Sequence, residues 1–141
     1  MILYTGGTFD IFHYGHMMFL RSCQKIASRV VVALNTDEFV QSYKAESTIL
    51  SYSERYKSIK TFDSSIDVVE NVGGYDSKPA ILTVSPDIIA IGDDWCKRDY
   101  YTQMNFTQEW LDENGILLVY IPYTRNISTS LIKSKIISYQ N

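Results

Sequence analysis

The chain has 141 residues, a length typical of one domain whose hydrophobic core needs no disulfide or metal staple. Hydrophobic residues make up 45% and charged residues 21%, which excludes the composition of a disordered chain. Thirteen basic and 16 acidic side chains give a net charge of −3, which argues against a protein that clamps nucleic acid through its phosphates. An anionic ligand therefore needs a local site.

Neither secretion nor membrane insertion is expected. The N-terminal segment has no basic region leading into an apolar one, and no run approaches the roughly 18 apolar residues of a membrane span. The two cysteines, Cys23 and Cys96, are too few and too far apart for a disulfide framework or a zinc site. We expect one domain over residues 1–141 in the reducing cytoplasm.

Short apolar runs rich in Val and Ile alternate with longer amphipathic stretches. The runs are almost continuously apolar, which is typical of parallel strands covered by helices on both faces. The expected strands are Met1–Thr5, Val30–Asn35, Ile66–Val69, Ile88–Ile91 and Ile116–Ile121. The expected helices are His16–Ile26, Ser53–Phe62, Ser77–Val84, Gln103–Asn114 and Ser128–Ser138, with Ser53, Ser77 and Ser128 as N-caps. This alternation predicts a parallel sheet in an α/β fold.

In such a sheet, ligands bind beyond the carboxyl ends of the strands. After the first expected strand, Gly6 and Gly7 allow a tight turn, and the amides that open the next helix can bind a phosphate. His13 and His16, the only histidines in the sequence, are spaced to lie on one side of a helical turn. A transition-metal pair is the weaker interpretation because no third ligand has a suitable spacing, and the G-x-G-x-x-G dinucleotide motif is absent. The segment favours phosphate chemistry.

The same segment carries a family resemblance. Gly7-Thr8-Phe9-Asp10-x-x-His13-x-Gly15-His16 resembles the signature of the cytidylyltransferase branch of the HxGH nucleotidyltransferases. The resemblance continues in order, over nearly the whole chain, through Asn35-Thr36-Asp37-Glu38-Phe39, Tyr52-Ser53-Glu54-Arg55, Gly92-Asp93-Asp94-Trp95 and Ile127-Ser128-Thr129-Ser130. Within this branch, the chain resembles the family of the glycerol-3-phosphate cytidylyltransferases. This resemblance implies a Rossmann-like, five-stranded parallel sheet flanked by helices (the nucleotidyltransferase fold) and a homodimer. It also implies CTP and a small phosphate monoester as substrates, with Mg²⁺ accompanying the triphosphate.

The resemblance also implies a mechanism and a set of site residues. A phosphate oxygen of the acceptor attacks the α-phosphorus of the triphosphate and pyrophosphate leaves, so catalysis depends on alignment and on hydrogen-bond donors. The resemblance implies catalytic roles for His13, His16 and Lys44. It implies that Lys44 and Lys78 bind the acceptor, and that Arg55 organises the active-site loop or the interface. Nucleotide binding falls to Thr8, Phe9, Asp10, Gly15, Gly92, Asp94, Thr124, Arg125, Ile127, Ser128, Thr129 and Ser130.

Several positions that are basic in this family are not basic here. Glu46 replaces a second lysine, Asp63 stands near the place of an arginine, and Tyr123 replaces an arginine that reappears two positions later as Arg125. These changes bear on the identity of the acceptor more than on nucleotidyl transfer. The alternatives are a related enzyme that uses another alcohol phosphate or ATP, and a nucleotide-binding regulatory protein without turnover. Retention of both histidines favours an enzyme.

Overall fold

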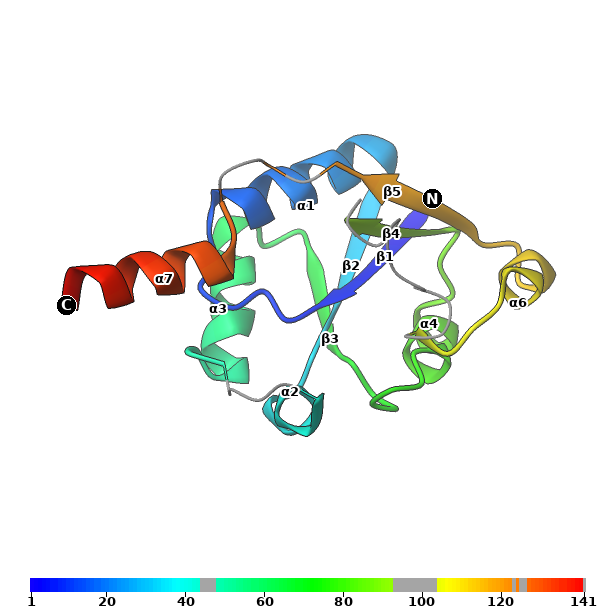
Figure 1. Cartoon of the computed structure of the whole chain (residues 1–141). Coiled ribbons are helices and arrows are strands. Elements are labelled where there is room, and N and C mark those ends of the chain that lie inside the picture. Colours follow the sequence, from blue (N-terminus) through cyan, green and yellow to red (C-terminus); the bar gives the residue numbers. More distant parts are fainter. Residues whose placement is uncertain (44–47, 93–103, 123, 125–126, 141) are drawn as a thin grey trace.

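A computed structural model of the chain describes residues 1–43, 48–92, 104–122, 124 and 127–140 (Figure 1). Within these residues, five parallel strands form one sheet in the order β3-β2-β1-β4-β5. The strands are β1 (Ile2–Gly7), β2 (Arg29–Leu34), β3 (Asp67–Glu70), β4 (Ile88–Gly92) and β5 (Leu117–Ile121). The expected α/β fold is confirmed, and every expected strand lies within two residues of its observed bounds.

Helices cover both faces of the sheet. Those described are α1 (Tyr14–Ile26), α2 (Asp37–Tyr43), α3 (Tyr52–Phe62), α4 (Lys78–Val84), α6 (Gln108–Glu113) and α7 (Thr129–Gln140). Leu3 and Tyr4 are neighbours in β1 and both are fully buried, because their side chains point to opposite faces. Leu3 belongs to a core cluster shared with α1 and α3, and Tyr4 to one shared with α4 and α6. The continuous apolar character of the central strands follows from this double coverage.

The topology fixes where a ligand can approach. From β1 in the middle of the sheet the chain runs outward to β2 and β3, then crosses to β4 on the other side of β1. The strand order therefore reverses between β1 and β4, where parallel sheets bind ligands beyond the carboxyl ends of the strands. Gly6 and Gly7 are the last residues of β1, and Gly92 is the last residue of β4.

The N-cap of α3 is Ser51, and the prediction of Ser53 is wrong. The Ser51 hydroxyl accepts from the amide of Glu54 at 3.2 Å, and Glu54 Oε1 accepts from the amide of Ser51 at the same distance. This reciprocal pair is the capping box that serine followed three residues later by glutamate forms. The sequence signal for this cap, serine followed three residues later by glutamate, is present at Ser51 and absent at Ser53.

The expected helix Gln103–Asn114 is also wrong at its start. The observed α6 begins at Gln108, because Thr107 caps it by accepting from the amide of Trp110 at 3.1 Å. Asn105 has φ of 58°, a left-handed conformation that interrupts a helix. The residue at position 103 lies outside the described part of the chain.

Helix α2 was not expected. It follows Thr36, whose hydroxyl accepts from the amide of Phe39 at 3.1 Å. Ser77 directly precedes α4 as predicted, but its hydroxyl donates to the carbonyl of Met104 at 2.6 Å and caps no amide. Ser128 directly precedes α7, and its hydroxyl accepts from the amide of Leu131 at 3.1 Å, as expected of an N-cap.

Figure 1 shows α7 reaching away from the sheet, with the C-terminus at its far end. Within the described ranges, no helix has both the length and the apolar character required to cross a membrane.

Candidate active site

Two stacked histidines form the start of α1. His13 is the N-cap and its Nδ1 accepts from the amide of Gly15 at 3.1 Å, while Nδ1 of His16 accepts from the amide of His13 at 3.3 Å. Their ring centroids are 3.8 Å apart and their planes differ by 18°. Because both Nδ1 atoms accept, each neutral imidazole carries its proton on Nε2. The pair therefore presents two Nε2–H donors from one helix terminus.

Burial keeps both imidazoles neutral. It lowers the pKa of His13, and it lowers the pKa of His16 to about 3, with His13 adding to the shift and Asp10 opposing it. The rings of Phe9 and Phe12 lie 5.2 Å and 5.5 Å from the His16 ring and supply much of its apolar surroundings. At neutral pH the pair offers hydrogen-bond donors and adds no positive charge.

The low pKa of His16 predicts a protein that loses stability in acid. In the unfolded chain this imidazole titrates near 6.5, so between about pH 6 and pH 4 only the unfolded state binds the proton. The free energy of unfolding should fall by about 1.4 kcal/mol per pH unit in that window because of this group. Urea unfolding at several pH values measures how the free energy of unfolding changes with pH. The His16→Asn variant should lack the part of this slope that one bound proton contributes. An identical slope in the variant would contradict the assignment.

Gly15 is required by close packing between the starts of α1 and α7. A Cβ at this position would lie 2.9 Å from both Cε1 and Nδ1 of His13, and 3.0 Å from Cγ2 of Ile127. Any larger residue would push against the imidazole or against Ile127. Glycine therefore brings the segment that leads into α7 against the histidine pair, although the two are far apart in sequence.

The carboxylate of Asp10 is committed to contacts within the protein. It is buried and accepts from the amides of Ile49 at 2.8 Å and Leu50 at 2.9 Å, and the ammonium of Lys133 lies 3.6 Å away. The hydroxyl of Thr129 donates to the carbonyl of Asp10 at 2.7 Å. Asp10 thus joins the loop between β1 and α1 to the segment before α3 and to the first turn of α7.

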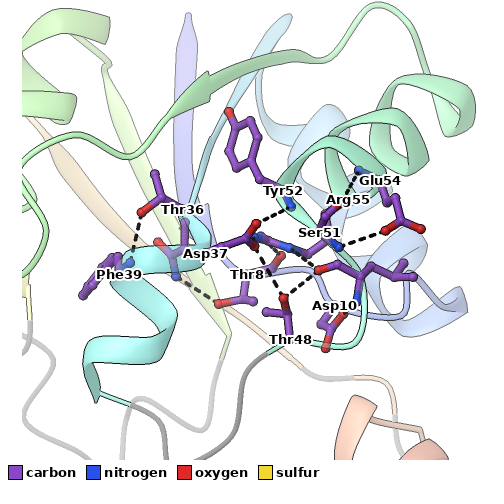
Figure 2. A network of polar contacts seen from close by, with 12 residues as sticks. Thr8, Asp10, Thr36, Asp37, Phe39, Thr48, Ser51, Tyr52, Glu54 and Arg55 are labelled. Atoms are coloured by element: carbon purple, nitrogen blue, oxygen red, sulfur yellow. Dashed lines mark hydrogen bonds and ion pairs between the residues drawn. The ribbon is translucent and has the colours of Figure 1, made fainter.

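Arg55 is a fully buried cation at the centre of a polar network (Figure 2). Its guanidinium contacts Asp37 Oδ1 at 2.7 Å, and donates to the carbonyls of Thr8 at 2.9 Å and Leu50 at 3.2 Å. Burial raises the pKa of Asp37, but hydrogen bonds from Arg55 and from the amide of Tyr52 outweigh this and lower it. Arg55 therefore fixes the backbone at Thr8 against α2 and α3.

Sequence reasoning gave no role to two asparagines that lie beside this loop. Asn35 Nδ2 donates to the hydroxyl of Thr8 at 3.0 Å, and Asn71 Nδ2 donates to Asn35 Oδ1 at 2.7 Å. Each is the first residue after a strand, Asn35 after β2 and Asn71 after β3. That position at the carboxyl edge was the available signal.

The ammonium of Lys78 binds within its own neighbourhood. It lies 3.1 Å from Asp76 Oδ1 and also donates to the carbonyl of Asn105. Burial raises the pKa of Asp76, but hydrogen bonds from Lys78 outweigh this and lower it. A phosphate that recruits this lysine has to compete with the carbonyl of Asn105.

The structure brings together part of the predicted site. The histidine pair and Gly15 lie beside Ile127. The loop that contains Thr8 and Asp10 is hydrogen-bonded to Thr129 through the carbonyl of Asp10. Phe9 is buried with φ of 52°, Thr124 and Ser128 are half-buried, and Ser130 is exposed. Lys44, Asp94 and Arg125 lie outside the described residues, as do Glu46, Trp95 and Tyr123. Where side chains are described, no group of three or more His, Cys, Asp or Glu residues could hold a metal ion.

The chain thus combines a five-stranded parallel sheet with two imidazole donors at the start of the helix that follows β1, beside the point of strand reversal. Residues 4–135 match the family described as cytidylyltransferase-like, which covers nearly the whole chain. The protein belongs to this cytidylyltransferase-like family and is a nucleotidyltransferase by its homologues.

Named relatives place it within the family. The glycerol-3-phosphate cytidylyltransferase of Bacillus spizizenii is 32% identical over 134 residues, 95% of each chain. The FAD synthase of Korarchaeum cryptofilum is 33% identical over 138 residues, 94% of this chain and 89% of that protein. The solved structure of a lipopolysaccharide core biosynthesis protein from Thermoplasma volcanium superposes with a TM-score of 0.69 at 20% identity. It covers 90% of this chain and 98% of that one, and shows the same fold.

Proposed function

We propose that the protein transfers CMP from CTP to a small alkyl phosphate, with glycerol 3-phosphate as the first candidate. An acceptor phosphate oxygen forms a bond to the α-phosphorus, the bond from that phosphorus to the β-phosphate oxygen breaks, and pyrophosphate leaves with a CDP-alcohol as the other product. The observation that carries the proposal is the pair of stacked, neutral histidines with Nε2–H donors at the strand reversal.

The chain's own residues supply donors for this reaction. The Nε2–H groups of His13 and His16 would bind oxygens on which charge accumulates as the α-phosphorus becomes five-coordinate, each worth a few kcal/mol. The amides that open α7, next to Ser128, would bind the β- and γ-phosphates, since helix N-termini favour anions. Contact between Gly15 and Ile127 places that helix start beside the histidine pair.

We propose Mg²⁺ as a companion of the triphosphate. The described residues offer no three-ligand cluster, and the carboxylate of Asp10 is occupied by amides and Lys133, so they fit an ion held mainly by phosphate oxygens and water. When bound, the ion neutralises charge on the phosphates. The homodimer and the cytoplasmic location stay predictions from the sequence.

A pyrophosphate-release assay tests the proposal. The protein is incubated with Mg²⁺, each of the four ribonucleoside triphosphates, and a panel containing glycerol 3-phosphate, longer polyol phosphates, amino-alcohol phosphates and FMN. We expect release with CTP and an alkyl phosphate. Release only with ATP and FMN would move the proposal to the activity named for the Korarchaeum relative. No release with any pair would overturn an enzymatic function and favour the non-catalytic nucleotide-binding alternative.

A further inference from the structure

A chain of hydrogen bonds runs along the carboxyl edge of the sheet from β3 to β1. The side-chain Nδ2 of Asn71 donates to Asn35 Oδ1, and the Nδ2 of Asn35 donates to the hydroxyl of Thr8, so both amide groups donate in the direction of β1. Both asparagines are buried, with Asn71 only 7% exposed. At the Asn71 end of this series of hydrogen bonds, the Oδ1 atom of Asn71 is buried and has no hydrogen-bond partner among the described residues.

An unpaired buried acceptor is unfavourable, because the carbonyl has lost its hydrogen bonds to water and gained none. Asn71 cannot easily turn to relieve this. Its backbone amide donates to the carbonyl of Leu34 at 2.9 Å, and its side-chain Nδ2 is held by Asn35 at 2.7 Å. The Oδ1 atom is therefore held in a fixed place, where a donor from outside the chain would satisfy it.

The position of Asn71 fits the acceptor half of the proposed reaction. If the nucleotide occupies the crevice between β1 and β4, the ends of β2 and β3 are left for the acceptor. Asn71 opens the loop of residues 71–77, and Lys78, the cation proposed to bind the acceptor phosphate, is the first residue of α4 directly after it. Gly73 folds this loop tightly, with φ of 97° and a Cβ position only 2.6 Å from the carbonyl oxygen of Asp76. This short segment thus runs from a buried acceptor without a partner among the described residues to the lysine proposed for the acceptor phosphate.

We propose that Asn71 Oδ1 accepts a hydrogen bond from a hydroxyl of the acceptor substrate, so that the enzyme selects hydroxylated alkyl phosphates over plain ones. The inference rests on the proposed nucleotidyl transfer to an alkyl phosphate. An ordered water is the other possible donor, and it would give no selectivity of this kind.

The experiment compares glycerol 3-phosphate with propyl phosphate, which has the same carbon chain and phosphate but no hydroxyl. With CTP and Mg²⁺, the wild-type protein should show kcat/KM about 10- to 100-fold higher for glycerol 3-phosphate, the effect of one buried hydrogen bond. Asn71→Leu and Asn71→Ala should lower kcat/KM for glycerol 3-phosphate by that factor and leave it nearly unchanged for propyl phosphate. The KM for CTP should not change.

Tyr4→Phe is the matched control. Among the described residues, the Tyr4 hydroxyl is the other buried side-chain nitrogen or oxygen atom without a hydrogen-bond partner. Tyr4 belongs to the apolar cluster beneath α4 and α6. Its removal should leave the preference for glycerol 3-phosphate intact. Circular dichroism and thermal melting verify that each variant folds, and the alanine variant serves if the leucine variant does not.

The possible outcomes distinguish a failure of the role given to Asn71 from a failure of the proposed nucleotidyl transfer. Equal activity of the wild type on both acceptors, or an equal loss on both in the Asn71 variants, would overturn the inference and leave nucleotidyl transfer standing. Loss of the preference in Tyr4→Phe as well would also overturn it. No pyrophosphate from the wild type with any acceptor of the panel would overturn the proposed function, and the inference with it.

Discussion

Replacing His16 with asparagine is expected to lower kcat by about 100- to 1000-fold, the usual effect of removing one donor to a developing oxyanion. The asparagine Oδ1 can occupy the place of Nδ1 and keep accepting from the amide of His13, so the helix cap survives. What is lost is the Nε2–H that would reach the phosphates. Steady-state kinetics of pyrophosphate release with saturating CTP measures the effect.

His16→Gln provides the matched comparison. Its amide reaches the region of Nε2 but leaves the amide of His13 without the acceptor that Nδ1 supplies. We expect this variant to keep more activity than His16→Asn and to melt at a lower temperature. If His16→Asn kept wild-type kcat, the histidine pair would be a structural cap and the mechanism proposed for it would be wrong.

Arg55→Met is expected to lower the free energy of unfolding by about 1–3 kcal/mol, because the carbonyls of Thr8 and Leu50 lose their donor, whereas the side chain of Asp37 is 37% exposed and can be hydrated. Methionine fills much of the volume but leaves Asp37 and the carbonyls of Thr8 and Leu50 without their donor. Urea unfolding, monitored by circular dichroism at pH 7, measures the change.

Arg29→Met is the control for burial. Arg29 forms an ion pair with Asp67 at the same 2.7 Å distance, but its side chain is 56% exposed, whereas that of Arg55 is fully buried. Exposed pairs contribute about 0–1 kcal/mol, so this variant should unfold almost like the wild type. Similar losses in the two variants would show that burial and the carbonyl contacts of Arg55 do not set its contribution.

The errors in the sequence predictions came from competing local signals. The apolar runs located the strands because double coverage by helices buries the central strands, as in β2, where every residue after the exposed Arg29 is apolar and buried. Ser51, and not Ser53, is the N-cap of α3, because only Ser51 has a glutamate three residues later to complete the capping box. α2 was missed because its seven residues are too short to show a clear helical period.

For the site, sequence reasoning placed the histidine pair correctly at the start of a helix, yet it could not assign partners. Nucleotide binding by Asp10 stays a prediction, and nothing in the sequence indicates that its carboxylate accepts from amides some 40 positions away, at Ile49 and Leu50. The sequence singles out Arg55 only through the family resemblance, and its contact with the carbonyl of Thr8 joins residues 47 positions apart. The unpaired oxygen of Asn71 has no signature in the sequence at all.

The amino-acid sequence by itself determined the parallel α/β sheet, the glycine-bracketed histidine turn and membership of a phosphate-chemistry family, because these depend on patterns within a few residues or on ordered motifs. Tertiary structure alone decided which polar groups pair with one another inside the protein and which have no partner among the described residues. That distinction depends on burial and on partners that lie up to 119 positions apart, as Thr129 and Asp10 do. Only folding brings such groups within hydrogen-bond distance.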